Sequence, residues 1–339
     1  MSDLTTHERP GVYSAYDVSS VVDSMAGAKT VALVAAGGGT VGQVYELTRY
    51  EAAVTAFGQD NPMAELTRIL FLNGAAAVVA VPAAEEEDYK AAFALLEGRE
   101  EIGVVVCDST DLTVQQALRD SVEAASEARQ ERVAVVCGAE ETVTELVARA
   151  KGINHQRVVL VASDQKEAAA AVAGAIAGTL DPAVPLGGAQ LRGLTGLNVR
   201  YTDNEIDLLV RGGVTPLETV AGKVTVVRGI TTKSMSGENP DSTWRELTTI
   251  LIVDDVIPAI RNSLRAKFSR AKNTVQSRGA IRAQVIVELE NKLEQEIITG
   301  YENVSVTPKE DNPTVCLVDF SFTVTHGINQ IWLTAHITV

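Results

Sequence analysis

The sequence predicts an α/β domain built on a mainly parallel sheet, followed by an α+β C-terminal domain, with an extended β-arm at each end of the chain. Residues 24–177 alternate short apolar runs with helical patterns, which is typical of a parallel sheet with helices on both faces. Residues 180–193 are rich in proline and glycine, and after them helical patterns precede strand patterns. The last nine residues alternate apolar and polar side chains up to the carboxyl end, which indicates a terminal strand.

Five apolar runs supply the expected strands of the parallel sheet: residues 30–36, 76–81, 102–107, 132–137 and 157–162. Such continuous runs are typical of strands that are buried on both faces. The helical patterns between them cover residues 49–57, 61–72, 84–97, 114–130, 140–151 and 165–177. Capping residues mark several of the helix starts, namely Thr48, Asn61 before Pro62, and Asp111 or Thr113.

The second half of the chain has a different organisation. Its patterns predict a short helix at 203–210, a strand at 224–227, a long helical region at 243–272 and a helix at 278–298. Pro258 should interrupt or kink the long helical region. Strands are expected at residues 304–307, 315–325 and 331–339. We therefore divide the chain into an N-terminal arm (1–23), an outer α/β domain (24–190), an α+β domain (191–326) and a C-terminal arm (327–339).

Composition and charge limit the function classes. The chain has 339 residues, 46% of them hydrophobic, and a net charge of −15. We expect a soluble globular protein made in the cytoplasm, because no signal peptide or membrane-spanning run is visible.

Residues 223–282 depart from the overall acidity, with eleven lysines and arginines against five acids. This basic segment indicates an acidic partner, and nucleic acid is the first candidate. Only Trp244 and Phe268 interleave with the charges, and no nucleic-acid motif surrounds them, so an acidic protein surface is favoured over DNA. A solvated helix face without a partner is the plainer alternative.

Residues typical of catalytic or metal sites are scattered along the chain. Cys107, Cys137 and Cys316 are widely spaced, and we expect them to be free thiols that are buried. None of the four histidines has a partner at metal-ligand spacing, so neither a metal nor another cofactor is expected. The adjacent acids Asp254–Asp255 and Glu140–Glu141 should diverge by about 100° on helices and face solvent.

Three glycines, Gly37, Gly39 and Gly42, follow an expected strand with the spacing of a dinucleotide-binding fingerprint. In that motif the third glycine lies in the first turns of a helix whose N-terminus faces the pyrophosphate. Here Gly42 is followed by a strand-like or irregular stretch, and the acid expected about 20 residues further on is missing. A glycine-rich surface loop is therefore favoured, and a nucleotide-dependent enzyme using this loop is the alternative function.

Both chain ends are predicted to be extended arms. Pro10 fixes φ and Gly11 permits an unusual turn, which argues against a helix at the N-terminus. A strand that ends the chain needs a partner, and pairing of each arm with a sheet edge of a neighbouring molecule would join subunits into an array. The candidate inter-subunit residues are Arg9, Pro10, Gly11, Val12, Tyr13, Ile331, Trp332, Leu333, Ala335, Ile337 and Val339.

An ordered set of short motifs resembles the sheath proteins of contractile tails, which occur in bacteriophages and phage-tail-like bacteriocins. In the N-terminal half the set comprises residues 9–13 (RPGVY), 31–42, 47–48, 57–58, 71–74 (FLNG) and 78–81. The C-terminal half matches more tightly, at residues 227–232 (VRGITT), 244, 253–254, 260–261, 272–273, 278–281 (RGAI) and 300–301. The resemblance spans nearly the whole chain, and its specificity lies in the order and spacing of the motifs.

This resemblance implies a structural protein that is not an enzyme. Sheath subunits of this kind polymerise around an inner tube through interlaced terminal arms, then contract from a metastable extended state and drive the tube through a target cell envelope. The implied partners are further copies of the chain, the inner tube protein, and baseplate and tail-terminator proteins. Nucleic acid binding and direct membrane insertion are not implied.

The resemblance also implies where the protein works and which surface meets the tube. The subunit would be made in a bacterial cytoplasm and would join a tail or tail-like particle that is released by lysis. In such assemblies the C-terminal domain faces the tube. The candidate tube-facing residues are therefore Arg261, Arg265, Lys267, Arg270 and Lys272.

Overall fold

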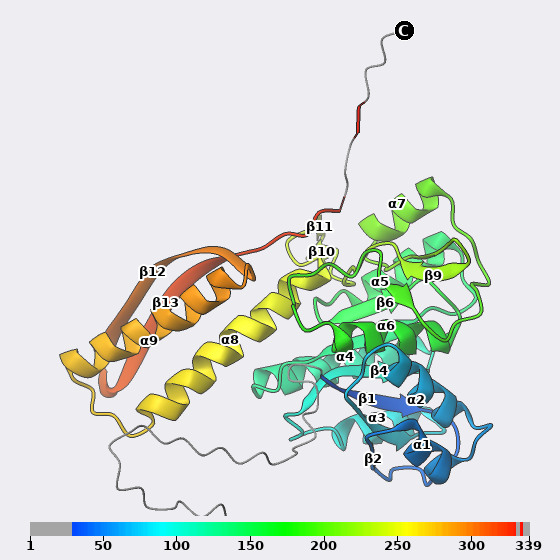
Figure 1. Ribbon diagram of the computed structural model, residues 1–339, viewed down its shortest axis with the longest axis horizontal. Coiled ribbons are helices and arrows are strands. Elements are labelled where there is room, and N and C mark those ends of the chain that lie inside the picture. The colour runs from blue at the N-terminus through cyan, green and yellow to red at the C-terminus, as the bar shows by residue number, and fades with distance from the viewer. Residues whose placement is uncertain (1–28, 330–332, 335–339) are drawn as a thin grey trace, which may run out of the picture.

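The computed structural model describes residues 29–329 and 333–334. Within them the chain forms a large α/β body and an elongated lobe made of two long helices and a β-hairpin (Figure 1). The predicted arm residues 9–13, 331–332 and 335–339 lie outside the described part of the chain. Leu333 is described, and it is almost fully exposed. The two arms therefore stay a prediction.

A six-stranded sheet forms the centre of the α/β body, with the strand order β2-β3-β1-β4-β5-β6. Five of its strands are parallel: β1 (Thr30–Ala35), β3 (Ala77–Pro82), β4 (Ile102–Cys107), β5 (Val133–Cys137) and β6 (Val158–Val161). The edge strand β2 (Tyr45–Leu47) is antiparallel to β3. The prediction of a mainly parallel sheet is confirmed, and each predicted strand matches its observed bounds to within one residue.

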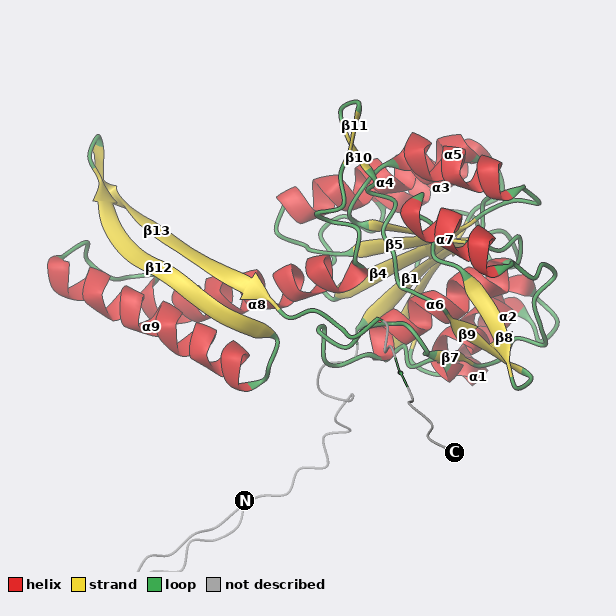
Figure 2. Ribbon diagram, turned by 90° about the horizontal axis from the view of Figure 1, so that it is seen from above, coloured by secondary structure: helices red, strands yellow, loops and turns green. Residues whose placement is uncertain are grey.

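Helices cover both faces of this sheet, as the alternating pattern predicted (Figure 2). One face carries α1 (Tyr50–Phe57), α2 (Pro62–Leu72) and α6 (Lys166–Gly178). The other face carries α3 (Glu86–Ala94), α4 (Leu112–Glu127), α5 (Val143–Ile153) and α7 (Asp203–Arg211). Successive strand residues alternate between the two cores, because Leu33 faces the first and Val34 the second.

Two of the predicted helix caps are confirmed. The side chain of Asn61 accepts a hydrogen bond from a backbone N–H in the first turn of α2, and Asp111 does the same for α4. The predicted cap at Thr48 is wrong, because α1 begins after Arg49, whose side chain makes no capping hydrogen bond.

Glycines allow α2 and α6 to approach each other closely. A Cβ atom on Gly174 would lie 2.8 Å from the carbonyl oxygen of Leu70, and one on Gly178 would lie 2.8 Å from the Cα atom of Gly74. These neighbours are backbone atoms, so neither helix can make room by rotating a side chain. The chain beyond Leu72 also needs a glycine at Gly74 for its φ of +112°.

A small antiparallel sheet closes one side of the α/β body. Its strands are β7 (Gln190–Leu191), β9 (Lys223–Val226) and β8 (Leu217–Val220), in that order. Leu191, Leu217 and Val226 of these strands come after the predicted domain boundary at residue 190, and yet they pack into the first core of the body. A two-residue hairpin, β10 (Met235–Ser236) with β11 (Asn239–Pro240), follows.

The elongated lobe contains α8 (Leu247–Phe268), α9 (Val275–Glu294), β12 (Ile298–Lys309) and β13 (Asn312–Val324). The predicted order of helices before strands is therefore observed. Pro258 does not interrupt α8, which continues through it. The last predicted helix, 278–298, began and ended too late: α9 begins at Val275, and after its end at Glu294 the left-handed φ of 59° at Glu296 reverses the chain.

We predict opposite effects from one substitution at two helical glycines. Gly174→Ala should destabilise the protein by about 1–3 kcal/mol, because its methyl group would overlap the backbone of α2. Gly279→Ala in α9 should stabilise it by up to about 1 kcal/mol, because an added Cβ atom would meet no atom outside its own stretch of helix within 4 Å. Urea unfolding followed by circular dichroism measures both changes. Equal effects at the two positions would contradict the close approach of α2 and α6.

Candidate functional site

The glycine-rich loop does not have the geometry of the dinucleotide fingerprint. Gly42 leads into the edge strand β2 instead of a helix, as expected from the sequence. The space beside the loop is filled by Asn61, whose Oδ1 atom accepts hydrogen bonds from the N–H groups of Gly38 and Met63. A Cβ atom on Gly37 would lie 2.8 Å from that same oxygen. The side chain of Asn61 therefore fills the space beside Gly37 and Gly38.

The crevice at the carboxyl ends of β1 and β4 is also filled by protein side chains. Ligands of open α/β sheets bind at this point, where the strand order reverses. Here Asp108, whose side chain is only 5% exposed, accepts hydrogen bonds from the N–H of Ala36 at 3.2 Å and from the hydroxyl of Tyr89 at 2.5 Å. Lys166 Nζ lies 3.5 Å from the same carboxylate. Burial and this hydrogen bond raise the pKa of the Tyr89 hydroxyl.

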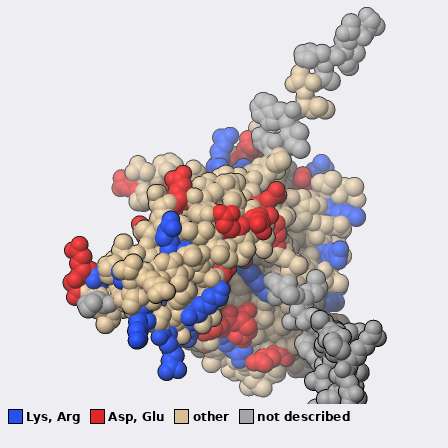
Figure 3. Space-filling view, turned by 60° about the vertical axis from the view of Figure 1, so that its left-hand side comes forward, with Lys and Arg blue, Asp and Glu red and all other residues tan. Residues whose placement is uncertain are grey.

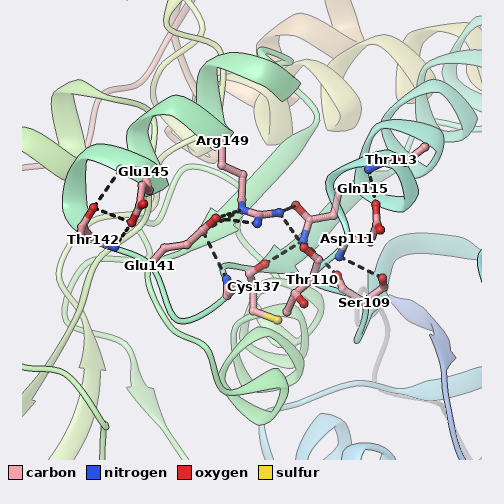
Figure 4. A network of polar contacts seen from close by, with 11 residues as sticks. Ser109, Thr110, Asp111, Thr113, Gln115, Cys137, Glu141, Thr142, Glu145 and Arg149 are labelled. Atoms are coloured by element: carbon pink, nitrogen blue, oxygen red, sulfur yellow. Dashed lines mark hydrogen bonds and ion pairs between the residues drawn. The ribbon is translucent and has the colours of Figure 1, made fainter.

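A third polar cluster ties together the loops after β4 and β5 (Figure 4). Arg149 on α5 donates to both oxygens of Glu141, with its closest contact at 2.7 Å, and to the carbonyl oxygen of Thr110. Its Nη1 also donates to Gln115, which in turn donates to the carbonyl oxygen of Cys137. The hydrogen bonds from Arg149 hold the pKa of Glu141 below its usual range.

This cluster corrects one sequence prediction. Glu140 and Glu141 lie before α5 and not on a helix, and the Glu141 side chain is 18% exposed instead of facing solvent. The three polar clusters occupy the carboxyl edge of the sheet with contacts inside the protein. Among residues 29–329 no group of three or more histidine, cysteine or acidic side chains is placed to hold a metal ion. The helices of that region are also too short or too polar to cross a membrane.

The opposite, amino edge of the sheet is where the elongated lobe is attached. Arg157, just before β6, forms two parallel hydrogen bonds to Asp254 of α8, at 2.6 and 2.9 Å. The side chains of Arg157 and Asp254 are 11% and 4% exposed. Burial raises the pKa of Asp254, and the hydrogen bonds from Arg157 oppose that rise. The prediction that both Asp254 and Asp255 face solvent is thus wrong for Asp254.

Further charged contacts join α8 to its surroundings. Arg261 pairs with Glu131, two residues before β5, and Lys292 of α9 pairs with Asp255 at 2.5 Å. Burial would raise the pKa of Glu131, but the hydrogen bonds from Arg261 hold it below its usual range. Lys29, at the start of the described chain, is half-buried near Asp254 and Asp255, and desolvation lowers its pKa.

A cleft of about 730 Å³ lies beside these contacts, between α8 and the amino ends of β4 and β5. Arg261 and Arg265, two of the five candidate tube-facing residues, line it. Lys267, Arg270 and Lys272 lie beyond it and are exposed, and Lys267 donates to Gln284 of α9 at 2.7 Å. Figure 3 shows lysines and arginines gathered at the lower edge of the lobe. The structure thus divides the five basic residues between a cleft and a free surface.

The β12–β13 hairpin is a two-stranded sheet, so each strand has one edge without a partner strand among the described residues. One face packs on α8 and α9 through side chains that include Val304, Phe320 and Phe322. Residues on the other face, such as Asp319 and Ser321, are exposed. β12 has 12 residues and β13 has 13. Long strands with unpaired edges can accept further strands.

Sequence reasoning missed the attachment of α8. Asp254 and Arg157 are 97 residues apart, and their spacing carries no motif that would pair them. The basic segment itself was visible, but its charges alone could not separate Arg261, which is paired, from Lys267, which is not paired with an acid among the described residues.

Two neighbouring aspartates should respond differently to the same substitution. Asp254→Asn should destabilise the protein by about 3–5 kcal/mol, because Arg157 would be left buried without an opposite charge. Asp255→Asn should lower the free energy of unfolding by about 1 kcal/mol or less, because the ion pair between Asp255 and Lys292 is more exposed. Thermal unfolding and the protease sensitivity of α8 measure the difference. Similar losses for the two variants would contradict the role assigned to the Arg157–Asp254 pair.

Comparison with known proteins identifies the family. The model of the phage tail sheath protein central domain matches residues 83–232, and the model of the phage tail sheath C-terminal domain matches residues 239–338. The tail sheath protein of Bacillus phage SP01 is 30% identical over 142 residues. That match covers 42% of this chain and 24% of the relative, so it spans about a quarter of the relative's length.

Solved structures show the same fold. The helical sheath of the anti-feeding prophage in its contracted state aligns with a TM-score of 0.73, at 15% identity, over 98% of this chain and 99% of that one. A sheath tail protein from Listeria innocua aligns with a TM-score of 0.72, at 13% identity, over 88% of this chain and 92% of that one. The motifs, the two family models and this fold agree, and the chain belongs to the phage tail sheath protein family.

Proposed function

We propose that the chain is the structural subunit of a contractile tail sheath, which polymerises around an inner tube through its terminal arms. The observation that carries this proposal is the β12–β13 hairpin, whose two long strands each have an unpaired edge within the described residues. Strand addition at such edges joins molecules by main-chain hydrogen bonds. The predicted arms, residues 9–13 and 331–339, supply the strands.

The path of the chain after β13 favours pairing between subunits over pairing within one. Thr325 donates a backbone hydrogen bond to Ile297, and the chain then returns toward the α/β body, where Gly327 lies against Pro185. Asn329 lies beside the first turns of α8. The C-terminal arm therefore starts away from the long edges of its own hairpin. Nine extended residues reach about 30 Å, enough to cross to a neighbouring subunit.

The tube contact is proposed for the five basic residues of the α8 region, with most weight on Lys267, Arg270 and Lys272. These three side chains are exposed and form no ion pair with any residue of the described chain. Exposed charge pairs contribute about 0–1 kcal/mol each and are screened by salt. Many such contacts with an acidic tube surface can hold an extended sheath and still release together.

Contraction would draw its free energy from new burial between subunits. At about 25 cal/mol per Å² of apolar area, a few hundred Å² gained per subunit supplies several kcal/mol, multiplied over the whole sheath. The arms would stay paired during this rearrangement and act as links. The sheath would then drive the tube through a target envelope.

The remaining proposals follow from the same role. Partners would be further copies of the chain, the inner tube, and baseplate and tail-terminator proteins. The subunit would assemble in a bacterial cytoplasm into a particle that is released by lysis. The domain boundaries at residues 23, 190 and 326 stay predictions. The anti-feeding prophage sheath is described as helical, which is the assembly proposed for this chain.

Deleting residues 331–339 should abolish polymerisation and leave a folded monomer, because the hairpin edges would lose the strand that completes them. Negative-stain electron microscopy at raised concentration, with light scattering, measures assembly. A matched control replaces the same nine residues by a sequence of equal length and the same alternation of apolar and polar side chains, which should still assemble. Normal tubes from the deleted chain would sink the proposal.

Charge reversal should separate tube binding from subunit folding. Lys267→Glu, Arg270→Glu and Lys272→Glu together should prevent extended sheath from forming on the tube, and the wild-type complex should weaken as salt is raised. The control reverses Arg200, Arg211 and Lys223, three exposed cations of the α/β body. Co-sedimentation with the tube protein gives the readout. Equal loss from both triple variants would show that net charge, and not this surface, decides binding.

A further inference from the structure

His155 is a buried histidine beside the attachment of the elongated lobe. It follows α5, and its side chain is 9% exposed. Two residues later comes Arg157, whose side chain holds Asp254 of α8. The backbone N–H of Arg157 donates to Nδ1 of the His155 ring at 3.2 Å. The residue that fixes α8 is therefore itself held by this ring.

The hydrogen bond from Arg157 determines which ring nitrogen carries the proton when His155 is neutral. A nitrogen that accepts a hydrogen bond carries no proton, so the proton lies on Nε2. Nε2 is 3.6 Å from Oε1 of Glu123 on α4, which is longer than a hydrogen bond. A second proton can be added only at Nδ1, where it would face the N–H of Arg157.

The backbone around His155 is fixed from the other side by Thr232. The N–H of His155 donates to the Thr232 hydroxyl oxygen at 3.0 Å, and that hydroxyl donates to the carbonyl oxygen of His155 at 3.0 Å. The N–H of Thr232 donates in turn to the carbonyl oxygen of Val158. A protonated ring can therefore avoid the N–H of Arg157 only by turning away from it or by displacing the Arg157 backbone.

The surroundings of the ring favour its neutral form. Burial lowers the pKa of His155; the Glu123 carboxylate opposes this fall, and the cations Arg157 and Arg119 add to it. Lys233, half-buried beside Thr232, is a further cation on the facing segment. Because the pKa in the folded protein lies below the unfolded value of about 6.5, the neutral ring contributes stability above that pH. This contribution is lost as the pH falls toward the pKa of the folded protein.

We propose that His155 makes the attachment of the lobe sensitive to acid. Protonation of Nδ1 replaces a hydrogen-bond acceptor by a donor, so the hydrogen bond from the Arg157 N–H breaks. The Arg157 side chain then loses its fixed starting point, and its two hydrogen bonds to Asp254 weaken. Acid thereby loosens α8 while the parallel sheet stays folded. The inference concerns a single subunit and does not depend on polymerisation.

Hydrogen exchange of the intact chain, followed by mass spectrometry at about pH 5.5 and about pH 7.5, tests this role. His155→Asn keeps an acceptor for the Arg157 N–H, since asparagine commonly bonds the backbone two residues on, and it cannot be protonated. Comparing the two proteins at one pH cancels the intrinsic pH dependence of exchange. Peptides from residues 247–262 should exchange about fivefold faster in the wild type at the lower pH, a difference of about 1 kcal/mol, and equally fast at the higher pH. Peptides from β1 should not differ.

Two further variants complete the test. His326→Asn, at an exposed histidine after β13, is the matched control and should leave α8 unchanged at both pH values. Glu123→Gln removes a carboxylate that favours the protonated ring, so it should move the acid transition of α8 to lower pH. The Glu123 side chain is 53% exposed, so this variant should fold.

Three results would overturn the proposal. One is equal exchange of α8 in the wild type and His155→Asn at the lower pH. Another is acid-dependent exchange that is confined to residues 143–154 and does not reach α8. The third is an unchanged acid transition in Glu123→Gln, which counts even where His155→Asn does not fold.

Discussion

The arrangement of the whole subunit depends on how α8 is fixed to the amino edge of the parallel sheet. The first turns of this helix belong to the core of the α/β body, through Leu247 and Ile250. Its middle belongs to the core of the elongated lobe, through Val256 and Ile260. The Arg157–Asp254 pair lies where the helix passes from one core to the other. This helix and its charged contacts therefore form one connection between the hairpin lobe and the α/β body, and the chain after β13, where Gly327 lies against Pro185, forms another.

Burial decides which charges on α8 hold the subunit together and which stay free. A buried ion pair is weak evidence for stability, because the cost of removing two charges from water offsets their attraction. Its stronger effect is on geometry, because two parallel hydrogen bonds fix the rotation of the helix as an apolar contact cannot. Near the end of the same helix, Lys267 and its neighbours keep their water and can meet a partner reversibly. The same basic segment thus contains cations that are paired inside the subunit, such as Arg261, and cations that are exposed to solvent, such as Lys267.

The parts of the structure that could be predicted are those decided by local patterns. The five parallel strands are buried on both faces, so each is a continuous apolar run, and their bounds were recovered almost fully. β8 was missed because Leu217–Val220 has only one buried residue and so lacks the continuous apolar run that marked the strands of the parallel sheet. The end of α9 was misplaced because nothing in the sequence near Glu296 marks its left-handed conformation. The burial of Asp254 was missed because its partner is distant in sequence, and a divergence of 100° between adjacent acids does not send both to solvent.

Free strand edges can pair with unrelated chains, and the irregular register of the β12–β13 hairpin limits such pairing. The β12–β13 register shifts at three places, between Ile298 and Gly300, between Glu302 and Ser305, and between Pro308 and Lys309. Asn303, inside the second shift, has a φ of 58°. Such bulges twist the edge and interrupt its ladder, so a flat strand from an unrelated chain would lose hydrogen bonds there.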